Sequence, residues 1–225
     1  YCLTDVNPHR YEYCLCSLKR KLSKHKGMNV VHINARSMYP KLDEMKWMVK
    51  LVDIDILCVT ETWFNEAFYN SDIEIPGYSV LRKDRVSDTI GGGVAIYLKD
   101  SIVHQYRPDI LTDKSLEMIW LELNTKGNER NILLCCCYRP PNSDTSYYDS
   151  MLDTIEKAQS EEKQIVILGD LNYNYVLNEN DYTHPIFKIE SMFALRQLIN
   201  SPTREANGTS TLLDIILTSC PDKIQ

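Results

Sequence analysis

Residues 164–172 read QIVILGDLN and contain the two features that decide the fold. The apolar run over residues 164–168 has the length and composition of a buried strand. Asp170 and Asn172 follow directly, where the strand gives way to a turn. The stretch therefore predicts a buried strand that delivers polar side chains to one end of a sheet.

The same pattern occurs at three other places in the chain. Asn34 follows a strand predicted over residues 29–33, and Glu61 follows one predicted over residues 55–59. Tyr138 closes a long strand predicted over residues 131–138. Strand ends in layered α/β domains bring side chains from distant parts of the sequence over a shared rim. A single Asp-x-Asn is usually only a turn former, so the ordered set of strand ends is the informative signal.

The other predicted elements are strands and helices in mixed order. Further strands are predicted over residues 94–98, 118–123 and 212–217, the second with the alternation of a half-buried strand, and helices over residues 42–52, 151–158 and 185–199. Several strands follow one another too closely to be joined by helices, which excludes a plain βαβ repeat. The pattern predicts an α/β domain over residues 28–225, built as a two-sheet sandwich flanked by helices. Residues 1–27 are predicted to be an irregular or helical lead-in.

Composition and charge limit the possible partners. The chain has 225 residues, 44% of them apolar, and no stretch near the roughly 20 apolar residues that span a bilayer, so no membrane partner is expected. The eight cysteines include no zinc-type C-x-x-C pair, and we expect reduced, mostly buried thiols. The net charge of −6 is unusual for a nucleic-acid binder. Residues 19–26 (KRKLSKHK) are basic and could contact phosphates, although a solvated face is the commoner explanation.

The ordered motifs resemble those of the endonuclease/exonuclease/phosphatase superfamily. Within it, they are most similar to the apurinic-type endonuclease domain of non-LTR retrotransposons of the jockey and chicken-repeat kinds. The resemblance covers about residues 29–217 and rests on NARS (34–37), ETW (61–63), IPGY (75–78), GGGVA (91–95), YRPP (138–141), GDLN (169–172) and LD (213–214). It implies a DNase I-like four-layer α/β/β/α sandwich. It also implies a Mg²⁺-dependent hydrolase, with Mn²⁺ as the alternative ion.

The resemblance implies a role for each matching residue. Glu61 would bind the metal, and Asn34 would help to position the metal site. Asp170 would orient or deprotonate the attacking water, while Asn172 would hold that water or a phosphate oxygen. Tyr138 would contact the phosphate. A metal, an amide and a phenol are groups that stabilise the charge developing on phosphate oxygens.

Four further residues are assigned in the same way. Asp214 matches an aspartate that orients a catalytic histidine in the family. Arg36 stands where the family has an acidic or polar residue of the metal region, and arginine suits a DNA phosphate. Arg139 and Thr203 are also predicted to contact DNA or phosphate.

The ends of the chain depart from the family pattern. The family's closing Ser-Asp-His motif is absent from this sequence, which runs from Tyr1 to Gln225. We therefore expect a C-terminally truncated domain, cut from a longer protein, with weak activity or none.

Three hypotheses about function remain open on the sequence. The first is a nuclease that nicks double-stranded DNA and leaves a 3′ hydroxyl for a reverse transcriptase domain of the same polyprotein. It would act in the nucleus after translation in the cytoplasm. The second keeps the fold but acts on another phosphoester, such as an inositol phosphate or a sphingolipid. The third is an inactive remnant of a decayed element. All five polar residues that match the family are intact, which argues against decay, because random drift would have changed at least one of them: Asn34, Glu61, Tyr138, Asp170 and Asn172.

Overall fold

The computed structural model describes residues 8–24, 27–86, 90–125, 130–175, 183–206 and 208–224. The helices are α1 (Pro8–Leu22), α2 (Leu42–Val52), α3 (Thr145–Gln159) and α4 (Pro185–Phe193), with 3₁₀ turns η2 (Tyr39–Lys41), η3 (Asn70–Ile73), η4 (Pro108–Ile110) and η5 (Pro221–Lys223). The strands are β1 (Val30–Asn34), β2 (Ile56–Thr60), β3 (Tyr78–Lys83), β4 (Val94–Lys99), β5 (His104–Tyr106), β6 (Glu117–Leu123), β7 (Ile132–Tyr138), β8 (Gln164–Asp170), β9 (Arg196–Gln197), β10 (Arg204–Ala206), β11 (Thr209–Thr211) and β12 (Asp214–Thr218).

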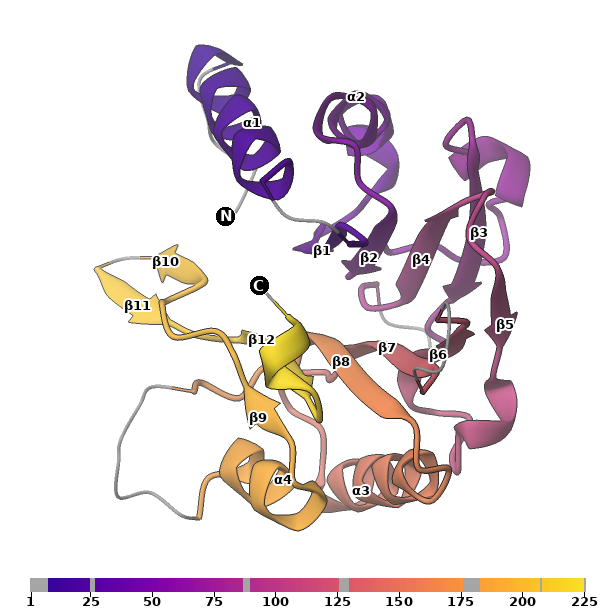
Figure 1. The fold of residues 1–225 in the computed structure, drawn as a ribbon, viewed down its shortest axis with the longest axis vertical. Helices are drawn as coiled ribbons and strands as arrows, with labels where there is room; N and C mark the ends of the chain where they lie inside the picture. Colours follow the sequence, from indigo (N-terminus) through magenta and orange to yellow (C-terminus); the bar gives the residue numbers. More distant parts are fainter. Residues whose placement is uncertain are drawn as a thin grey trace.

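The strands form two stacked sheets with helices on their outer faces (Figure 1). One sheet has the order β1-β2-β4-β3 and is covered by α1 and α2. The other has the order β5-β6-β7-β8-β12-β9 and is covered by α3 and α4. The predicted four-layer α/β/β/α sandwich is confirmed. Strands β10 and β11 form a separate hairpin. No helix within the described residues is long and apolar enough to cross a membrane.

Each pair of adjacent layers encloses its own apolar core. The outer cores lie between helices and sheets, and the central core, which contains Ile96, Leu121 and Leu168, lies between the two sheets. The three consecutive cysteines divide between cores as a strand requires: Cys135 and Cys137 face the helices, and Cys136 faces the other sheet.

Strand β6 corrects the prediction of a half-buried strand over residues 118–123. All seven of its residues are buried, because helices cover one face of its sheet and the other sheet covers the opposite face. Its two carboxylates are compensated rather than solvated: Glu117 pairs with Arg85, and Glu122 pairs with Arg107 and Lys163. Alternation in the sequence here marks buried ion pairs, not an exposed face.

Other boundaries also differ from the predictions. The helix predicted over residues 185–199 ends at Phe193, because Ala194 adopts a left-handed conformation (φ 49°) and the chain turns into β9. Strands β3, β5, β9, β10 and β11 were missed. The lead-in contains a helix, α1, which buries Leu15 in the core that it shares with α2; residues 1–7 and 25–26 lie outside the described part.

The sheet topology explains why the polar strand ends meet. Strands β1 and β2 are parallel, as are β7 and β8, so each pair ends on the same side of its sheet. Gly169 lets β7 and β8 approach closely just before Asp170. A Cβ at Gly169 would lie 1.7 Å from the carbonyl oxygen of Cys137, so a side chain cannot be accommodated there.

Candidate active site

Four predicted site residues lie at the carboxyl ends of two parallel strand pairs. Asn34 is the last residue of β1 and Glu61 follows β2, while Tyr138 and Asp170 end β7 and β8. Tyr138 and Asp170 are direct partners in the β7–β8 ladder. Because the sheets are stacked, the two strand pairs present these side chains to a common edge.

Asn34 links the two carboxylates across the sandwich. Its Nδ2 donates to Oε1 of Glu61 at 2.9 Å and to Oδ2 of Asp170 at 2.6 Å. Its Oδ1 accepts the backbone N–H of Arg36 at 3.2 Å. One amide therefore joins groups from both sheets and limits the separation of two negative charges, which would otherwise repel one another.

The carboxyl group of Asp170 is buried at the end of β8. Burial raises the pKa of Asp170, and the nearby charge of Asp214 raises it further, while hydrogen bonds from Asn172 and Asn34 act in the opposite direction. The backbone N–H of Asn172 donates to Oδ1 of Asp170 at 2.9 Å. The Asn172 side chain donates to the carbonyl of Arg139 at 2.8 Å, which fixes the turn after β8 against the turn after β7.

Tyr138 remains a neutral hydrogen-bond donor at physiological pH. Burial raises the pKa of Tyr138 to about 12, and the charges of Glu61 and Asp170 contribute to the shift. A phenol in this state can donate to a phosphate oxygen without an ionisation step.

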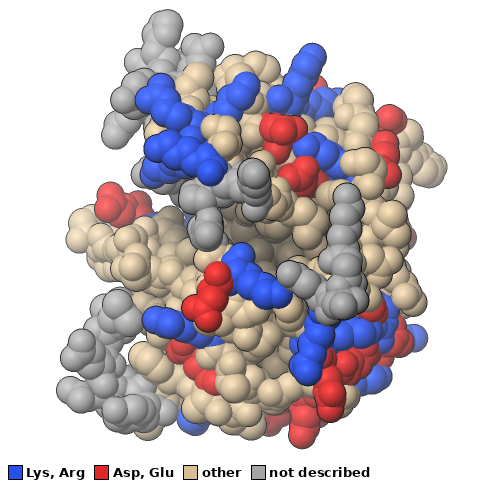
Figure 2. All heavy atoms as spheres, viewed as in Figure 1, with Lys and Arg blue, Asp and Glu red and all other residues tan. Residues whose placement is uncertain are grey.

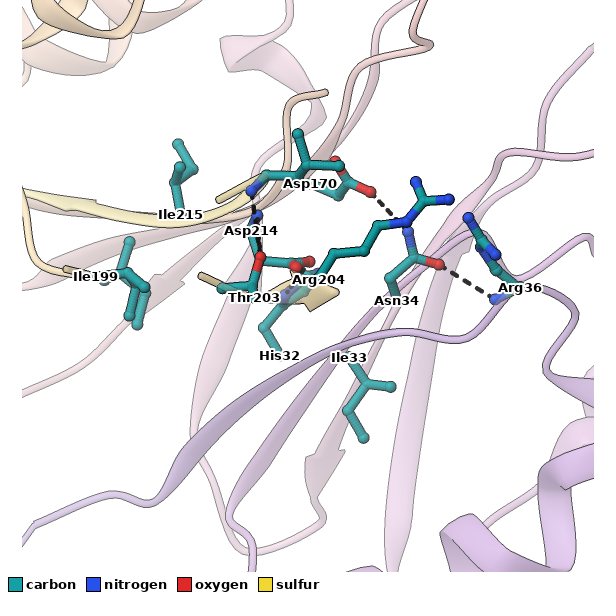
Figure 3. Close-up of a pocket in the computed structure, with 12 residues that line it drawn as sticks. His32, Ile33, Asn34, Arg36, Asp170, Ile199, Thr203, Arg204, Asp214 and Ile215 are labelled. Carbon is teal, nitrogen blue, oxygen red and sulfur yellow. Dashed lines mark hydrogen bonds and ion pairs between the residues drawn. The ribbon is translucent and has the colours of Figure 1, made fainter. Parts of the chain in front are cut away.

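A cavity of about 220 Å³ adjoins the Asn34–Asp170 pair (Figure 3). Thr203, Arg204 and Asp214 line it on the side of the six-stranded sheet. The Thr203 hydroxyl accepts the backbone N–H groups of Leu213 and Asp214, both at 3.2 Å. Arg36 and Arg204 also line this cavity, so two arginines lie at the same site as Asn34 and Asp170 (Figure 3).

The remaining predicted site residues, Asp214, Arg36 and Arg139, differ in their burial and in the groups that they contact. Asp214 is the ladder partner of Asp170, and burial raises the pKa of its carboxyl as well. Arg36 is exposed beside Asn34. Arg139 is only 6% exposed, lies 3.9 Å from the centre of the Tyr173 ring, and donates to backbone carbonyls. In this arrangement Arg139 holds two loops together rather than facing solvent.

Sequence reasoning missed three residues at the site: His32, Trp63 and Arg204. Nδ1 of His32 lies 3.5 Å from Oδ1 of Asp214, and its Nε2 lies 3.1 Å from the Thr60 hydroxyl. Burial lowers the pKa of His32 to about 4, so the ring is neutral at pH 7. Period-two alternation was the available signal for His32, since it places His32 on the same face of β1 as Asn34.

The backbone around the site is unusually strained. Among the described residues, five non-glycine positions with positive φ cluster in its loops: Arg36 (42°), Ser37 (74°), Glu61 (52°), Trp63 (58°) and Asn172 (51°). Such conformations cost energy and persist only where the surroundings enforce them. Trp63 also donates from Nε1 to Oε2 of Glu61 at 3.3 Å, which orients the carboxylate.

The donor set fits a hard divalent cation. Glu61 and Asp170 present carboxylate oxygens on either side of the Asn34 amide nitrogen, and Mg²⁺ prefers oxygen ligands while retaining several waters. Within the described ranges, no group of three or more His, Cys, Asp or Glu side chains is arranged so that it could hold a metal ion by itself.

Comparisons with known proteins identify the family of this chain. The profile of the Endonuclease/Exonuclease/phosphatase family matches residues 29–219. A search of curated protein sequences finds no match.

Three solved structures illustrate the similarity of the fold. The endonuclease domain of TRAS1, a telomere-specific non-LTR retrotransposon, has a TM-score of 0.62 at 14% identity, covering 84% of this chain and 83% of that one. The Xenopus laevis APE2 catalytic domain has a TM-score of 0.64 at 15% identity, covering 85% and 82%. The Neisseria 3′ phosphatase NExo, bound to a product DNA hairpin, has a TM-score of 0.62 at 13% identity, covering 87% and 88%.

Proposed function

Because the chain belongs to the endonuclease/exonuclease/phosphatase family, whose members are hydrolytic nucleases and phosphatases, we propose that it is a metal-dependent DNA endonuclease. Its role would be to nick target DNA so that a reverse transcriptase domain of the same polyprotein can prime synthesis in the nucleus. The observation that supports this most directly is the hydrogen-bonded Glu61–Asn34–Asp170 arrangement, beside a cavity that Arg36 and Arg204 also line.

Each residue contributes a separate part of phosphodiester hydrolysis. Glu61, with Asn34, would hold a divalent cation that supplies electrophilic stabilisation of phosphate charge. Asp170 accepts a proton from the attacking water, and the Asn172 N–H holds its other oxygen in place. Tyr138 donates its hydroxyl hydrogen to a phosphate oxygen as negative charge builds there.

The raised pKa of Asp170 suits a general base, because a base with a higher pKa takes up a proton more readily. The same shift means that the carboxylate form is lost at a higher pH than for an ordinary aspartate. Activity should therefore decline on the acid side as Asp170 becomes protonated.

DNA is the substrate that the surroundings favour. Arg36 and Arg204 are both exposed, and guanidinium groups bind phosphates through paired hydrogen bonds. The chain's net charge of −6 does not prevent this, because DNA affinity depends on the local cations that replace counterions. The family match and the fold are equally compatible with another phosphoester, so the assay must separate these substrates.

The protein that carries this domain is expected to convert supercoiled plasmid into open circles in Mg²⁺, whereas residues 1–225 alone, whose sequence has no Ser-Asp-His, should do so weakly or not at all. EDTA should stop the reaction, and excess Mg²⁺ or Mn²⁺ should restore it, because the oxygen ligands suit both ions. Nicks should be extendable by a DNA polymerase, which requires a 3′ hydroxyl. Intact plasmid, together with metal-dependent release of phosphate from a small phosphoester, would instead favour the phosphatase alternative.

The basic end of α1 should add DNA affinity without sequence preference. Lys19, Arg20 and Lys21 are exposed in its last turn, and Figure 2 shows basic side chains gathered over this part of the molecule; His25 and Lys26 lie outside the described residues. Changing all three to Gln should reduce the slope of log affinity against log salt by about 2–3, since each phosphate contact contributes about 0.9.

Fluorescence anisotropy with a DNA duplex in EDTA measures this slope. A matched control replaces three exposed lysines elsewhere, Lys50, Lys114 and Lys188, with Gln and makes the same change in net charge. Equal slopes in the two triple variants would mean that the basic residues of α1 are merely solvated and do not contact DNA.

A further inference from the structure

An ion pair beside Tyr138 has no part in the site described so far. Nε of Arg85, which follows β3, donates to Oε1 of Glu117 at 2.6 Å. The two side chains are only 19% and 5% exposed. A buried pair of this kind costs desolvation energy, so it calls for an explanation beyond surface charge.

Glu117 fastens the two sheets together at the active-site edge. Its Oε2 accepts the backbone N–H of Gly93, which immediately precedes β4 of the other sheet. Its own backbone N–H donates to the Tyr147 hydroxyl at 3.0 Å, and that hydroxyl donates to the Tyr138 carbonyl at 3.0 Å. Glu117 is also the ladder partner of Tyr138. The main chain of Tyr138 is thus held by its pairing with Glu117 and by the Tyr147 hydroxyl that both residues contact.

Arg85 holds the Tyr138 side chain in addition to these backbone contacts. Its guanidinium carbon lies 5.6 Å from the centre of the Tyr138 ring, within cation–π range. Burial opposes the charge, but hydrogen bonding and attraction to Glu117, with a further contribution from Tyr138, raise the pKa of Arg85. The cation therefore remains charged against the ring.

The glycine run 91–93 makes room for this guanidinium. A Cβ on Gly92 would lie 2.3 Å from Cζ of Arg85, and Gly92 has φ +70°, which side chains rarely adopt. A Cβ on Gly91 would lie 3.6 Å from Nη1 of Arg85 and 3.7 Å from Nε1 of Trp63, the indole that orients Glu61. The guanidinium therefore lies between the phenol and the loop that holds the metal-binding carboxylate.

We propose that Arg85 and Glu117 are positioning residues that hold the Tyr138 phenol in its phosphate-binding orientation. Glu117 holds the two sheets together at this point through its bond with Gly93, and Arg85, which is bonded to Glu117, packs against the Tyr138 ring. The proposal rests on the proposed function for its effect on catalysis, but the orientation itself is a property of the protein alone.

A double-mutant cycle on nicking tests the catalytic part. Arg85→Gln should lower kcat by about 10- to 100-fold, as displacement of a reacting group does, with little change in KM. In a Tyr138→Phe background the same substitution should cause almost no further loss, because its effect passes through the phenol. The matched control is Arg82→Gln, which removes a nearby arginine that pairs with Asp84 instead; its kcat should remain at the wild-type value.

Fluorine NMR tests the orientation without any assay of activity. The protein is labelled with 3-fluorotyrosine, and the Tyr138 resonance is identified by its absence in Tyr138→Phe. Arg85→Gln should shift or broaden this resonance, and Gly92→Ala, which leaves Arg85 present but displaces it, should do the same. Arg82→Gln should leave it unchanged. Urea unfolding of each variant identifies any that is not folded.

The outcomes separate the two proposals. If Arg85→Gln multiplies the Tyr138→Phe loss by its full factor, or leaves the fluorine resonance unchanged in a folded protein, the positioning role is wrong. Should Arg85→Gln not fold, Arg85→Lys replaces it: lysine keeps the charge but cannot bond Glu117 and lie flat on the ring together. Wild-type kcat and spectrum in Arg85→Lys would overturn the proposal. If the protein that carries this domain lacks nuclease activity, the proposed function fails, and the fluorine spectra still decide the positioning role.

Discussion

Replacing Glu61 with alanine in the protein that carries this domain is expected to reduce plasmid nicking in Mg²⁺ by about 100-fold or more, as loss of a key electrostatic group does. Glu61 accepts hydrogen bonds from both Asn34 and Trp63, so its carboxylate is fixed before any cation binds. Alanine removes the metal ligand and leaves two donors aimed at an empty position. Nicking is measured as conversion of supercoiled to open-circular plasmid over time.

Two further variants make the result specific to the carboxylate. Glu61 has φ 52°, so alanine at this position could reduce activity by changing the local backbone rather than by removing the carboxylate. Glu61→Gln retains the shape of the side chain and the hydrogen bond from Asn34, and it should show a similar loss because it lacks the charge. Glu66→Ala removes an exposed carboxylate from the same loop and should keep wild-type activity. Wild-type nicking by Glu61→Ala at saturating Mg²⁺ would remove Glu61 from the metal site.

Asp170→Ala should cause a loss of about 100- to 10,000-fold, the range expected when a general base is removed. Asn172→Ala should cause a smaller loss, because the backbone N–H that holds Asp170 remains in place. The double variant should be little worse than Asp170→Ala, since Asn172 acts through the position of Asp170 and their effects are not additive.

Stability measurements distinguish this loss from unfolding. Burial and the charge of Asp214 both raise the pKa of Asp170, so at neutral pH the ionised carboxylate disfavours the folded state. This destabilisation is absent below the pKa of an ordinary aspartate and is fully present above the raised one. Asp170→Asn should therefore be at least as stable as wild type at pH 8, as measured by urea unfolding.

Fully multiplicative losses of nicking activity in the Asp170–Asn172 double variant would show that the two residues act separately.

The elements that the sequence predicted well are those buried on both faces. Strands β2, β7 and β8 read as apolar runs, and α2 places Met45, Val49 and Val52 at helical spacing, so local pattern and tertiary burial agree. Strand β3, with sequence YSVLRK, was missed because every residue is partly exposed at the edge of its sheet. The two-residue β9 carries too little pattern to be recognised, and only its pairing with β12 defines it.

The sequence by itself determined a two-sheet sandwich flanked by helices and the polar residues at the strand ends, because apolar strands followed by Asn34, Glu61, Tyr138 and Asp170 are local patterns. Its ordered motifs determined the family, and the resemblance to that family implied the four-layer fold. Only the tertiary structure decided which groups meet. The Asn34 bridge to Asp170 spans 136 positions in sequence, and the approach of His32 to Asp214 depends on two stacked sheets. Arg85 and Glu117 look like surface charges in sequence, yet they are buried beside Tyr138, because burial depends on the layers that pack over a strand and not on the residues within it.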